Sequence, residues 1–303
     1  MSLYHKYRPE TLEEVVGNET VIASVQDMLS KPNTCPHAFL LSGGTGCGKT
    51  TVARIMAREF GSSGGDLHEV DSAEDRGIDG IRRMIRLSQY RAMESDAIVW
   101  ILDESHKLTG DAQSALLKIL EDTPSHVYFI LWTTDPQKLL PTIRNRCTQY
   151  EMKPLSESQM MRLLRKVVKA EEGSMSKEVY NQIIQDSLGH PRSALQILDV
   201  VLRLDPNDQL EAATKAAEHV SASIDLCRLL IQGSGWKRVA EVLTGLKDEQ
   251  PESIRRHVLG YCQSILLKAD NPRAGLVMEE MIEPFYNTGY PGLVFACYSI
   301  VKG

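Results

Sequence analysis

The stretch LLSGGTGCGKTTVARIMA, residues 40–57, constrains the fold of this chain more than any other. Gly43, followed after four residues by Gly48-Lys49-Thr50, matches the phosphate-binding P-loop pattern. The apolar run 37–41 before it predicts a buried strand, and residues 51–60 predict a helix that Gly61 ends. Such a turn can curl its backbone N–H groups around phosphate, because few side chains block the approach and the helix dipole favours an anion. The context of strand, turn and helix therefore favours a nucleotide site over a glycine-rich connection without a ligand.

The chemistry of the loop predicts ATP with Mg²⁺ as the ligand. Lys49 supplies a point charge for the β and γ phosphates, and Thr50 a hydroxyl ligand for Mg²⁺. The other residues expected to contact the nucleotide are Gly43, Gly44, Thr45, Gly46, Cys47, Gly48 and Thr51.

Two adjacent carboxylates end the next strongly apolar run, AIVWILDES at 97–105. In open α/β sheets, ligands bind at the carboxyl ends of the strands. Asp103 fits the role of holding Mg²⁺, directly or through water, and Glu104 fits a base that orients and deprotonates the attacking water. The alternative is a cluster of acids at the start of a helix. The following run, VYFILWTTDPQ, ends in Thr133 and Thr134, whose hydroxyls could contact the water or the γ-phosphate.

The first half of the chain alternates strand-like and helix-like segments, which predicts an α/β fold with a largely parallel sheet. After the first strand, we expect strands at 67–70, 97–102, 127–133 and 149–152. Beyond Pro154 only helical periodicity is present. The predicted domains are an α/β core with the P-loop at 1–153, a small helical domain at 154–206 and an all-helical domain at 207–303.

Composition excludes several other classes of protein. With 303 residues, 42% of them hydrophobic, the chain can form two or three domains with buried cores. No apolar run approaches the ~20 residues of a membrane span, and the N-terminus is polar, so we expect an intracellular protein. The six cysteines are scattered without metal-ligand spacing, which argues against zinc and disulfides. A net charge of −6 limits nucleic-acid binding to a local basic surface.

Six motifs in order give the chain a family resemblance: KYRPETLEEVVGN, GGTGCGKT, RGIDGIR, ILDESHKLTGDAQSALLKILEDTP, LWTTDPQKLLPTIRNRC and GHPRSALQILD. Over residues 4–204 this set resembles the AAA+ ATPase subunits of DNA-polymerase clamp loaders. The resemblance is strongest to bacterial gamma/tau chains and more distant to the small subunits of replication factor C and to phage clamp loaders. The resemblance implies a AAA+ core, a lid and a helical collar that joins subunits into a homo- or hetero-pentamer. It also implies an ATPase, stimulated by DNA and clamp, that opens a sliding clamp and loads it onto primer–template DNA in replication.

One departure from the bacterial pattern concerns metal. Bacterial gamma/tau chains carry a four-cysteine zinc module after the P-loop helix, where this chain has only FGSSGGDLHEV. We therefore expect no zinc, and the chain resembles a compact phage version that would act in the cytoplasm of a bacterial or phage-infected cell.

The resemblance also assigns roles to individual residues. It implies that Thr133 and Thr134 form sensor 1, with Thr134 favoured, and that Arg146 in NRC, where the family has Ser-Arg-Cys, is the arginine finger. Arg192 in GHPR would be sensor 2 and contact the nucleotide, although it could also be a surface arginine at a helix end. A guanidinium suits both roles because it stays charged and binds phosphate bidentately. The adenine pocket would be lined by Tyr7, Arg8, Pro9, Val15 and Val16.

A locally basic segment at 81–93 is the candidate DNA-binding surface. Arg82, Arg83 and Arg86 share one face of the expected helix, and Arg76 and Lys107 would extend it. We refer to these five residues as the basic ridge. Supported by the resemblance, the ridge predicts contacts to phosphates without base readout. A solvated helix face is the alternative.

Two other functions are compatible with parts of the pattern. A non-catalytic structural subunit of a clamp loader would not need Lys49, Asp103, Glu104 or Arg146, all of which are present. Another AAA+ motor on DNA, such as a helicase loader or a branch-migration motor, is disfavoured by the segment TTDPQKLLPTIRNRC and by a helical tail.

Overall fold

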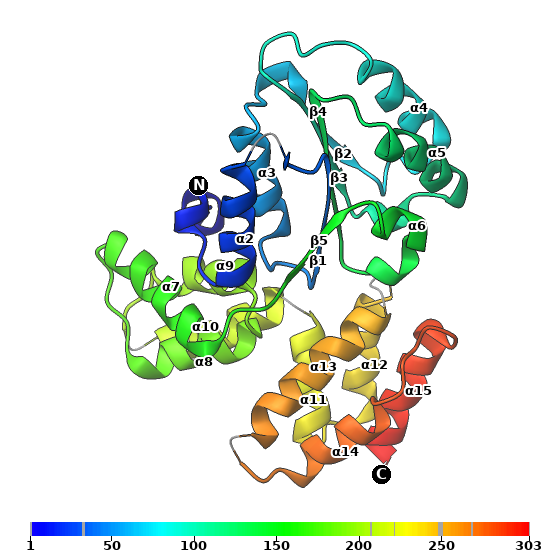
Figure 1. The fold of residues 1–303 in the computed structure, drawn as a ribbon. Helices are drawn as coiled ribbons and strands as arrows, with labels where there is room; N and C mark the ends of the chain where they lie inside the picture. The colour runs from blue at the N-terminus through cyan, green and yellow to red at the C-terminus, as the bar shows by residue number, and fades with distance from the viewer. Residues whose placement is uncertain are drawn as a thin grey trace. The chain divides into compact units, whose positions relative to one another are not determined.

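The computed structural model describes residues 2–31, 34–206, 208–220, 222–247, 251–267 and 269–302. Its contacts divide the chain into two units (Figure 1). We call Tyr7–Ser156 the P-loop unit, and Met1–Lys6 together with Glu157–Gly303 the helical unit. The division at 156/157 lies close to the predicted end of the ATPase core, but the first six residues group with the helices. The second predicted boundary lies between residues 206 and 207, and residue 207 is outside the described residues.

A five-stranded parallel sheet forms the centre of the P-loop unit, in the order β2-β3-β4-β1-β5. Its strands are β1 (Ala38–Gly43), β2 (Leu67–Asp71), β3 (Ile98–Asp103), β4 (Val127–Thr133) and β5 (Thr148–Met152). All five expected strands are present. The predicted α/β fold with a parallel sheet is therefore confirmed.

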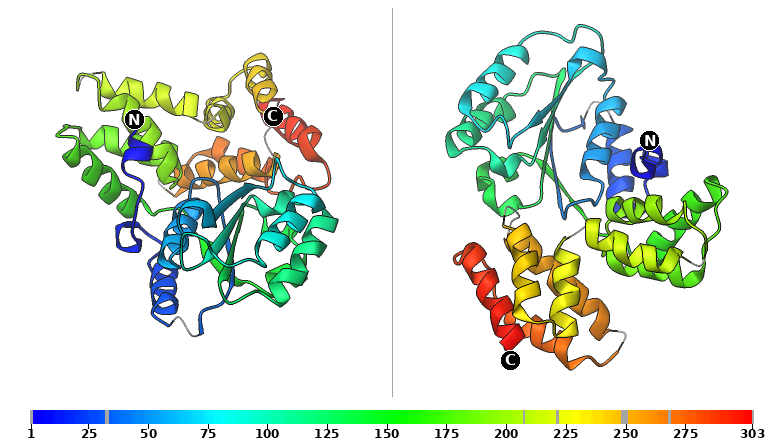
Figure 2. Two further views of the ribbon diagram at one scale, coloured as in Figure 1. Left: turned by 90° about the horizontal axis from the view of Figure 1, so that it is seen from above. Right: turned by 180° about the vertical axis from the view of Figure 1, so that it is seen from behind.

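Helices cover both faces of this sheet (Figures 1 and 2). On one face lie α2 (Glu19–Leu29) and α3 (Lys49–Glu59), and on the other α4 (Ile78–Leu87) and α5 (Gly110–Glu121). Successive strand residues point to opposite faces, so Phe39 and Leu41 pack towards α2 and α3, whereas Leu40 packs towards α4 and α5. Both faces are apolar, which explains the nearly continuous hydrophobic runs of β1, β3 and β4.

Shorter elements complete the P-loop unit. They are η1 (Leu12–Glu14), η3 (Gly64–Asp66), η4 (Ser105–Lys107), η5 (Pro136–Lys138) and α6 (Pro141–Arg144). Two of these short elements, η4 and η5, directly follow strands β3 and β4, at the sheet edge where the candidate site lies.

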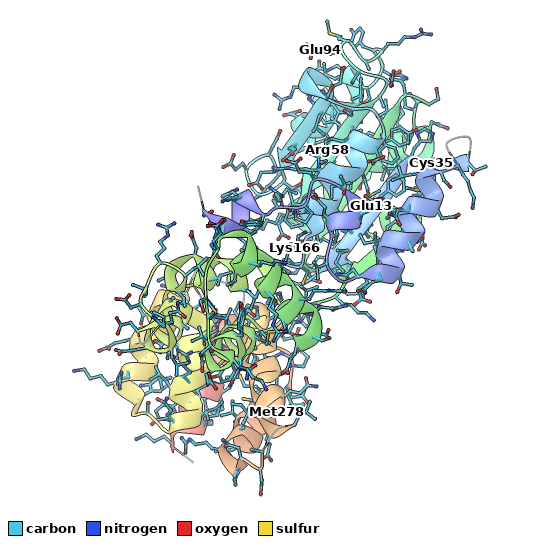
Figure 3. All side chains as sticks on the ribbon, turned by 90° about the vertical axis from the view of Figure 1, so that its left-hand side faces the viewer. Glu13, Cys35, Arg58, Glu94, Lys166 and Met278 are labelled. Atoms are coloured by element: carbon cyan, nitrogen blue, oxygen red, sulfur yellow. The ribbon has the colours of Figure 1, made fainter. Side chains whose placement is uncertain are left out.

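The short interval between α3 and β2 is organised by a buried carboxylate. Asp66 accepts hydrogen bonds from the backbone N–H groups of Met93 and Glu94 and from the Ser95 hydroxyl at 2.7–3.1 Å. Glu94, labelled in Figure 3, accepts in turn from the Gly65 N–H at 3.2 Å. These bonds fix the loop before β3 onto this interval, in which the sequence analysis expects no zinc module. Absence of bound zinc stays a prediction.

The helical unit begins with α1 (Leu3–Lys6), which packs against α9. Its further helices are α7 (Glu157–Ala170), α8 (Lys177–Ser187), α9 (Pro191–Val201), α10 (Gln209–Val220), α11 (Ala222–Gln232), α12 (Trp236–Gly245), α13 (Pro251–Leu266), α14 (Pro272–Glu280) and α15 (Gly289–Lys302). Helices α11 to α15 share one core, which contains Leu230, Val258 and Leu293. The α10 helix packs on α8 and α9, although the sequence places it in the third domain. No helix in the described ranges is long and apolar enough to cross a membrane.

Candidate nucleotide-binding site

The P-loop connects the end of β1 to the start of α3, as its spacing predicts. Gly43 has φ 143°, and a Cβ there would lie 2.2 Å from the Met152 carbonyl oxygen, so only glycine fits beside β5. Gly48 precedes α3 with φ 93°, and its carbonyl accepts the first helical bond, from Val52. The loop is therefore held open between a strand and a helix N-terminus, as a phosphate cradle requires.

Lys49 is buried at the first position of α3. Its ammonium donates to the carbonyl oxygens of Gly43 and Gly44 at 2.9 and 2.8 Å, and lies 4.9 Å from the centroid of the Trp132 ring. Burial lowers the pKa of Lys49, although Glu104 and Asp103 act against this shift. The Trp132 ring and the carbonyl oxygens of Gly43 and Gly44 thus hold the charge of Lys49 against the P-loop.

Asp103 ends β3 beside the edge strand, where the register pairs it with Asp71. Burial, with the nearby charges of Glu104 and Asp71, raises the pKa of Asp103 to about 6. Its Oδ1 is buried and has no hydrogen-bond partner among the described residues. A buried carboxylate oxygen without a donor is the kind of group that a divalent cation or its water shell would satisfy.

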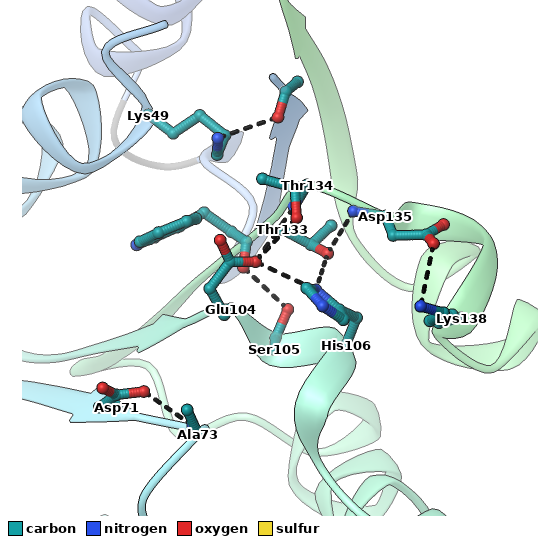
Figure 4. Close-up of polar contacts among 12 residues, drawn as sticks. Lys49, Asp71, Ala73, Glu104, Ser105, His106, Thr133, Thr134, Asp135 and Lys138 are labelled. Carbon is teal, nitrogen blue, oxygen red and sulfur yellow. Dashed lines mark hydrogen bonds and ion pairs between the residues drawn. The ribbon is translucent and has the colours of Figure 1, made fainter. Parts of the chain in front are cut away.

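Glu104 adopts a left-handed conformation, φ 45° and ψ 46°, which aims its side chain at the end of β4 (Figure 4). Its Oε2 accepts from the Thr134 N–H at 3.3 Å and from the Thr134 hydroxyl at 3.1 Å, and lies 3.1 Å from His106 Nδ1. Burial acts to raise the pKa of Glu104, but His106, Lys49 and Thr134 together lower it. A strained backbone and a stabilised carboxylate at one position are typical of functional sites.

These residues fit Mg²⁺ and a nucleoside triphosphate. The cradle at Gly43 admits no side chain, Lys49 supplies the positive charge, and Thr50 and Asp103 supply oxygen ligands that Mg²⁺ prefers. The two threonines differ, since Thr133 is fully buried against His106 Nδ1 at 2.8 Å whereas Thr134 contacts Glu104. Of the two, Thr134 therefore lies beside the predicted base.

The N-terminal segment expected to line the adenine pocket is fixed onto α3. Arg8 Nε donates to the Thr51 hydroxyl at 3.1 Å, and Arg58, labelled in Figure 3, donates to the Glu10 carbonyl oxygen at 2.6 Å. Val15 packs on the core under α2 and α3. The remaining expected residues, Tyr7, Pro9 and Val16, are half-buried. The segment is thereby held next to the P-loop helix.

Arg146 lies at the opposite end of the sheet from the P-loop of its own chain. It precedes β5, whose first residue Thr148 pairs with Phe39, whereas the P-loop begins at Gly43. Phe39 and Gly43 are four residue steps apart along β1, or roughly 13 Å. The Arg146 guanidinium pairs with Glu121 at the end of α5 and donates to the Thr142 carbonyl at 3.0 Å. The structure does not bring Arg146 together with Lys49 and Glu104.

Arg192 belongs to the helical unit, in the first turn of α9. Its guanidinium lies 5.1 Å from the centroid of the Tyr4 ring, a cation–π contact between α9 and α1. Tyr4 is not among the residues that the sequence predicts for the site. The role of Arg192 as sensor 2 stays a prediction.

The basic ridge is exposed on α4 and the loops beside it. Arg82 and Arg83 are 64% and 68% exposed, and they pair with Asp79 and Asp75 at 3.3 and 3.2 Å. Arg86 is exposed on the same helix, opposite the buried Ile81 and Met84. The Arg76 carbonyl accepts from the Thr109 N–H at 3.1 Å, which brings Arg76 near exposed Lys107. All five residues of the basic ridge are exposed, and acids pair with two of them.

Sequence reasoning missed His106 and Trp132. His106 bridges Glu104 and Thr133, and Trp132 lies under Lys49. Their positions relative to two strand ends offered a weak signal, because His106 is two residues after Glu104 and Trp132 is directly before Thr133.

A P-loop, paired acids at the end of a parallel strand and a following helical unit define an AAA+ P-loop protein. The fold is similar to that of the RuvB Holliday junction branch migration motor of Thermotoga maritima, with a TM-score of 0.59 over 78% of this chain and 85% of that one. At 19% identity this likeness concerns the fold alone.

Sequence relatives identify the branch of this class. Residues 2–72 match the Rad17 P-loop domain family, and residues 63–156 match the family of the DNA polymerase III delta subunit. The chain is 36% identical over 225 residues to subunit gamma/tau of DNA polymerase III from Mycobacterium tuberculosis H37Rv, and 33% identical over 300 residues to subunit tau from Escherichia coli K12. The chain belongs to the clamp-loader AAA+ family that these gamma/tau subunits represent.

The alignments cover 67% and 90% of this chain but 39% and 46% of those two relatives, so the chain spans less than half of their length. The longer alignment extends past residues 4–204, where the motifs of the sequence analysis end. Kinship with gamma/tau subunits therefore includes part of the C-terminal helices.

Proposed function

We propose that the chain binds MgATP at the P-loop and hydrolyses it as a subunit of a clamp loader. The observation that carries the proposal is the cluster at the ends of β3 and β4, where Glu104 is held by Thr134 and His106 close to the P-loop lysine. A glycine-rich turn without ligand would need neither this cluster nor the strained conformation of Glu104.

Each residue of the cluster has a step in the proposed reaction. Lys49 and the N–H groups of the P-loop bind the β and γ phosphates, and Asp103 and Thr50 hold Mg²⁺. A Mg²⁺ ion held by these two residues would supply positive charge against the charge that develops on the phosphate oxygens. Glu104 is ionised at neutral pH because its pKa is lowered, so its carboxylate can orient the attacking water and accept its proton. Thr134 fixes that carboxylate through its hydroxyl and N–H.

Two arginines would complete the site. We assign Arg192 to the nucleotide of its own chain and Arg146 to the nucleotide of a neighbouring chain, whose transition-state charge it would stabilise. For Arg146 the support is its place at the far end of β1 from the P-loop.

In the assembled machine, ATP binding would close the subunits around primer–template DNA and an opened sliding clamp, and hydrolysis would release both. Helices α7 to α9, with α10 packed on them, would be the lid, and helices α11 to α15 the collar that joins the subunits. This proposal extends the kinship with DNA polymerase III gamma/tau subunits to a chain that spans less than half of their length.

Two substitutions test the roles of Lys49 and Glu104. Lys49→Ala should abolish tight ATP binding, because it removes the phosphate-binding charge. Glu104→Gln should bind ATP as the parent does but hydrolyse it at least about 100-fold more slowly. Binding is measured by titration and turnover by phosphate release. Lys31→Ala, at an exposed position just after α2, is the control for loss of a lysine. Equal loss of binding in both variants would contradict these roles.

The clamp-loader assignment has its own assay. ATP turnover should rise more with primer–template DNA and a DNA polymerase III sliding clamp together than with either alone. A four-way DNA junction is the comparison substrate, because the fold is shared with a branch migration motor. Stimulation by the junction without any effect of the clamp would favour the other AAA+ motor.

A further inference from the structure

The turn between α8 and α9 contains a strained residue. Leu188 ends α8 with φ 50° and ψ 34°, and Gly189 follows with φ 77°. Positive φ is rare for a bulky side chain, because Cβ crowds the backbone, and it persists only where the surroundings enforce it. Arg192, the proposed sensor 2, lies four residues after Leu188.

Contacts with the following helices enforce this conformation. The Leu188 side chain packs against the core shared by α11 to α15. The His190 ring lies 5.7 Å from the His257 ring of α13, centroid to centroid, and His257 Nδ1 is 3.0 Å from the hydroxyl of buried Ser223 on α11. One end of the turn therefore packs on the core that α11 to α15 share, and the other end lies against α13, which is itself joined to α11 by His257 and Ser223.

A buried ion pair ties the last turn of α8 to the same helices. Asp186 is fully buried, and its Oδ2 accepts from Arg228 of α11 and from Gln182, each at 2.8 Å. Arg228 also donates to the Thr214 carbonyl of α10 at 2.9 Å and hydrogen-bonds to Tyr261 of α13. Breaking such a pair leaves a charge without its partner in the interior, so α8 resists sliding on α11.

The turn also sets the start of α9. The His190 N–H donates to the Ser187 carbonyl at 2.8 Å, and the Ala194 N–H donates to the His190 carbonyl at 3.1 Å. Because Pro191 is the first residue of α9, the direction of the helix is set by the residues just before it. Leu188 and His190 therefore connect Arg192 to α11 and α13, so a shift of either helix would also move Arg192.

We propose that Leu188 and His190 are positioning residues, which transmit the placement of helices α11 and α13 to Arg192. The inference rests on the proposed role of Arg192 at the nucleotide. It adds a route by which the helices assigned to subunit assembly would control ATP affinity.

The docking itself is tested by hydrogen exchange on the full chain without nucleotide. Leu188→Asn tolerates positive φ but cannot pack on the apolar core, and Leu188→Met keeps an apolar side chain. Exchange over residues 190–198 should be at least about tenfold faster in Leu188→Asn and close to the parent in Leu188→Met. Leu243→Ala, which truncates a core residue on α12, controls for general loosening of that core. Unchanged exchange in Leu188→Asn, or the same increase in Leu243→Ala, overturns the docking.

The transmission is tested by a double-mutant cycle on ATP affinity. Leu188→Asn should weaken ATP binding about tenfold in the parent but less than about twofold in an Arg192→Ala background, since the route ends at Arg192. Leu188→Met should restore the affinity. Equal losses in the two backgrounds overturn the inference while leaving the P-loop function intact. If Arg192→Ala alone binds and hydrolyses ATP like the parent, the role of Arg192 is wrong and the transmission with it, whereas the exchange result still decides the docking.

Discussion

At the scale of single residues, Asp103 and Glu104 are adjacent carboxylates whose surroundings shift their acidities in opposite directions. Asp103 faces burial and two like charges, so its pKa rises to about 6. Glu104 is also buried, but contacts with His106 and Thr134 stabilise its ionised form and lower its pKa. The charge on Asp103 therefore costs folding free energy that a cation would offset, whereas the charge on Glu104 is already compensated by the protein.

This contrast predicts a pH-dependent gain of stability in Asp103→Asn without nucleotide. A carboxyl whose pKa is raised from 3.8 to about 6 destabilises the fold fully above pH ~6, and the penalty disappears as pH falls below the unfolded value. At pH 7 the variant should be more stable by about 1 kcal/mol, a value discounted for partial solvation, and at pH 5 the gain should fall to roughly half.

Thermal unfolding of the P-loop unit between pH 5 and 8 measures this gain. The control is Asp27→Asn on α2, which removes an exposed ion pair of little expected value. A gain that stays constant or grows on acidification would show that the charge of Asp103 is not the cause.

The site residues that could be predicted from sequence alone are those at a fixed spacing from a motif or from the end of a strand. Lys49 follows the glycines of the P-loop, and Asp103 and Glu104 follow a buried strand, so a parallel sheet brings them to one edge. His106 and Trp132 escaped because their contacts depend on how η4 and β4 pack, and no spacing rule describes that packing. The cation–π contact between Arg192 and Tyr4 joins residues 188 positions apart and could not be read from pattern either.

At the scale of elements, α4 is the clearest case of two faces with different tasks. Ile81 and Met84 are buried against the sheet, while Arg82, Arg83 and Arg86 lie on the exposed face. Ion pairs with Asp79 and Asp75 reduce the field of Arg82 and Arg83. A DNA phosphate would therefore have to displace a weak surface ion pair in order to bind Arg82 or Arg83, whereas Arg86 has no such pair among the described residues.

If the basic ridge tracks phosphates, Arg82→Glu with Arg86→Glu should weaken DNA binding about equally for unrelated sequences. The dependence of affinity on salt should also become shallower, by about one unit of slope for each lost phosphate contact. Titrations of two unrelated primer–template duplexes at several salt concentrations measure both effects.

The matched control is Lys166→Glu with Lys169→Glu, the same charge change on exposed positions of α7, where Figure 3 labels Lys166. ATP binding should survive in both variants. If the α4 variant keeps full DNA-stimulated ATPase, its face is merely solvated.

The elements of the P-loop unit were predictable because strand and helix leave different periodicities in a chain that alternates them. The β strands differ from their predicted bounds by at most two residues at either end, and β4 matches at both ends. The helical unit was less predictable in its grouping. Helical periodicity shows that α10 has an apolar face, but not that this face packs on α8 and α9 rather than on the helices that follow.

At the scale of the whole molecule, the P-loop unit holds four residues of the proposed hydrolytic site at one edge of its sheet, whereas Arg192 belongs to the helical unit. Lys49, Asp103, Glu104 and Thr134 follow strand ends at that edge, whereas Arg146 precedes β5 at the other. If Arg146 completes the proposed site, its place at this end of the sheet favours the P-loop of another copy over that of its own chain. Such an arginine contributes ~10³ or more in rate when it closes on the phosphate.

The last prediction follows from this separation. Arg146→Ala and Glu104→Gln should each bind ATP and hydrolyse it poorly, because each removes one component of the shared site. When the two variants are mixed and exchange subunits, some interfaces combine an intact Glu104 with an intact Arg146 from the other chain, and turnover should partly return. Phosphate release measures turnover, and native mass spectrometry verifies that mixed complexes have formed. The control mixture pairs Lys49→Ala with Glu104→Gln, in which every site still lacks a group from the same chain. If complexes that contain both chains hydrolyse ATP no faster than the average of their parents, Arg146 serves its own chain and the shared site is excluded.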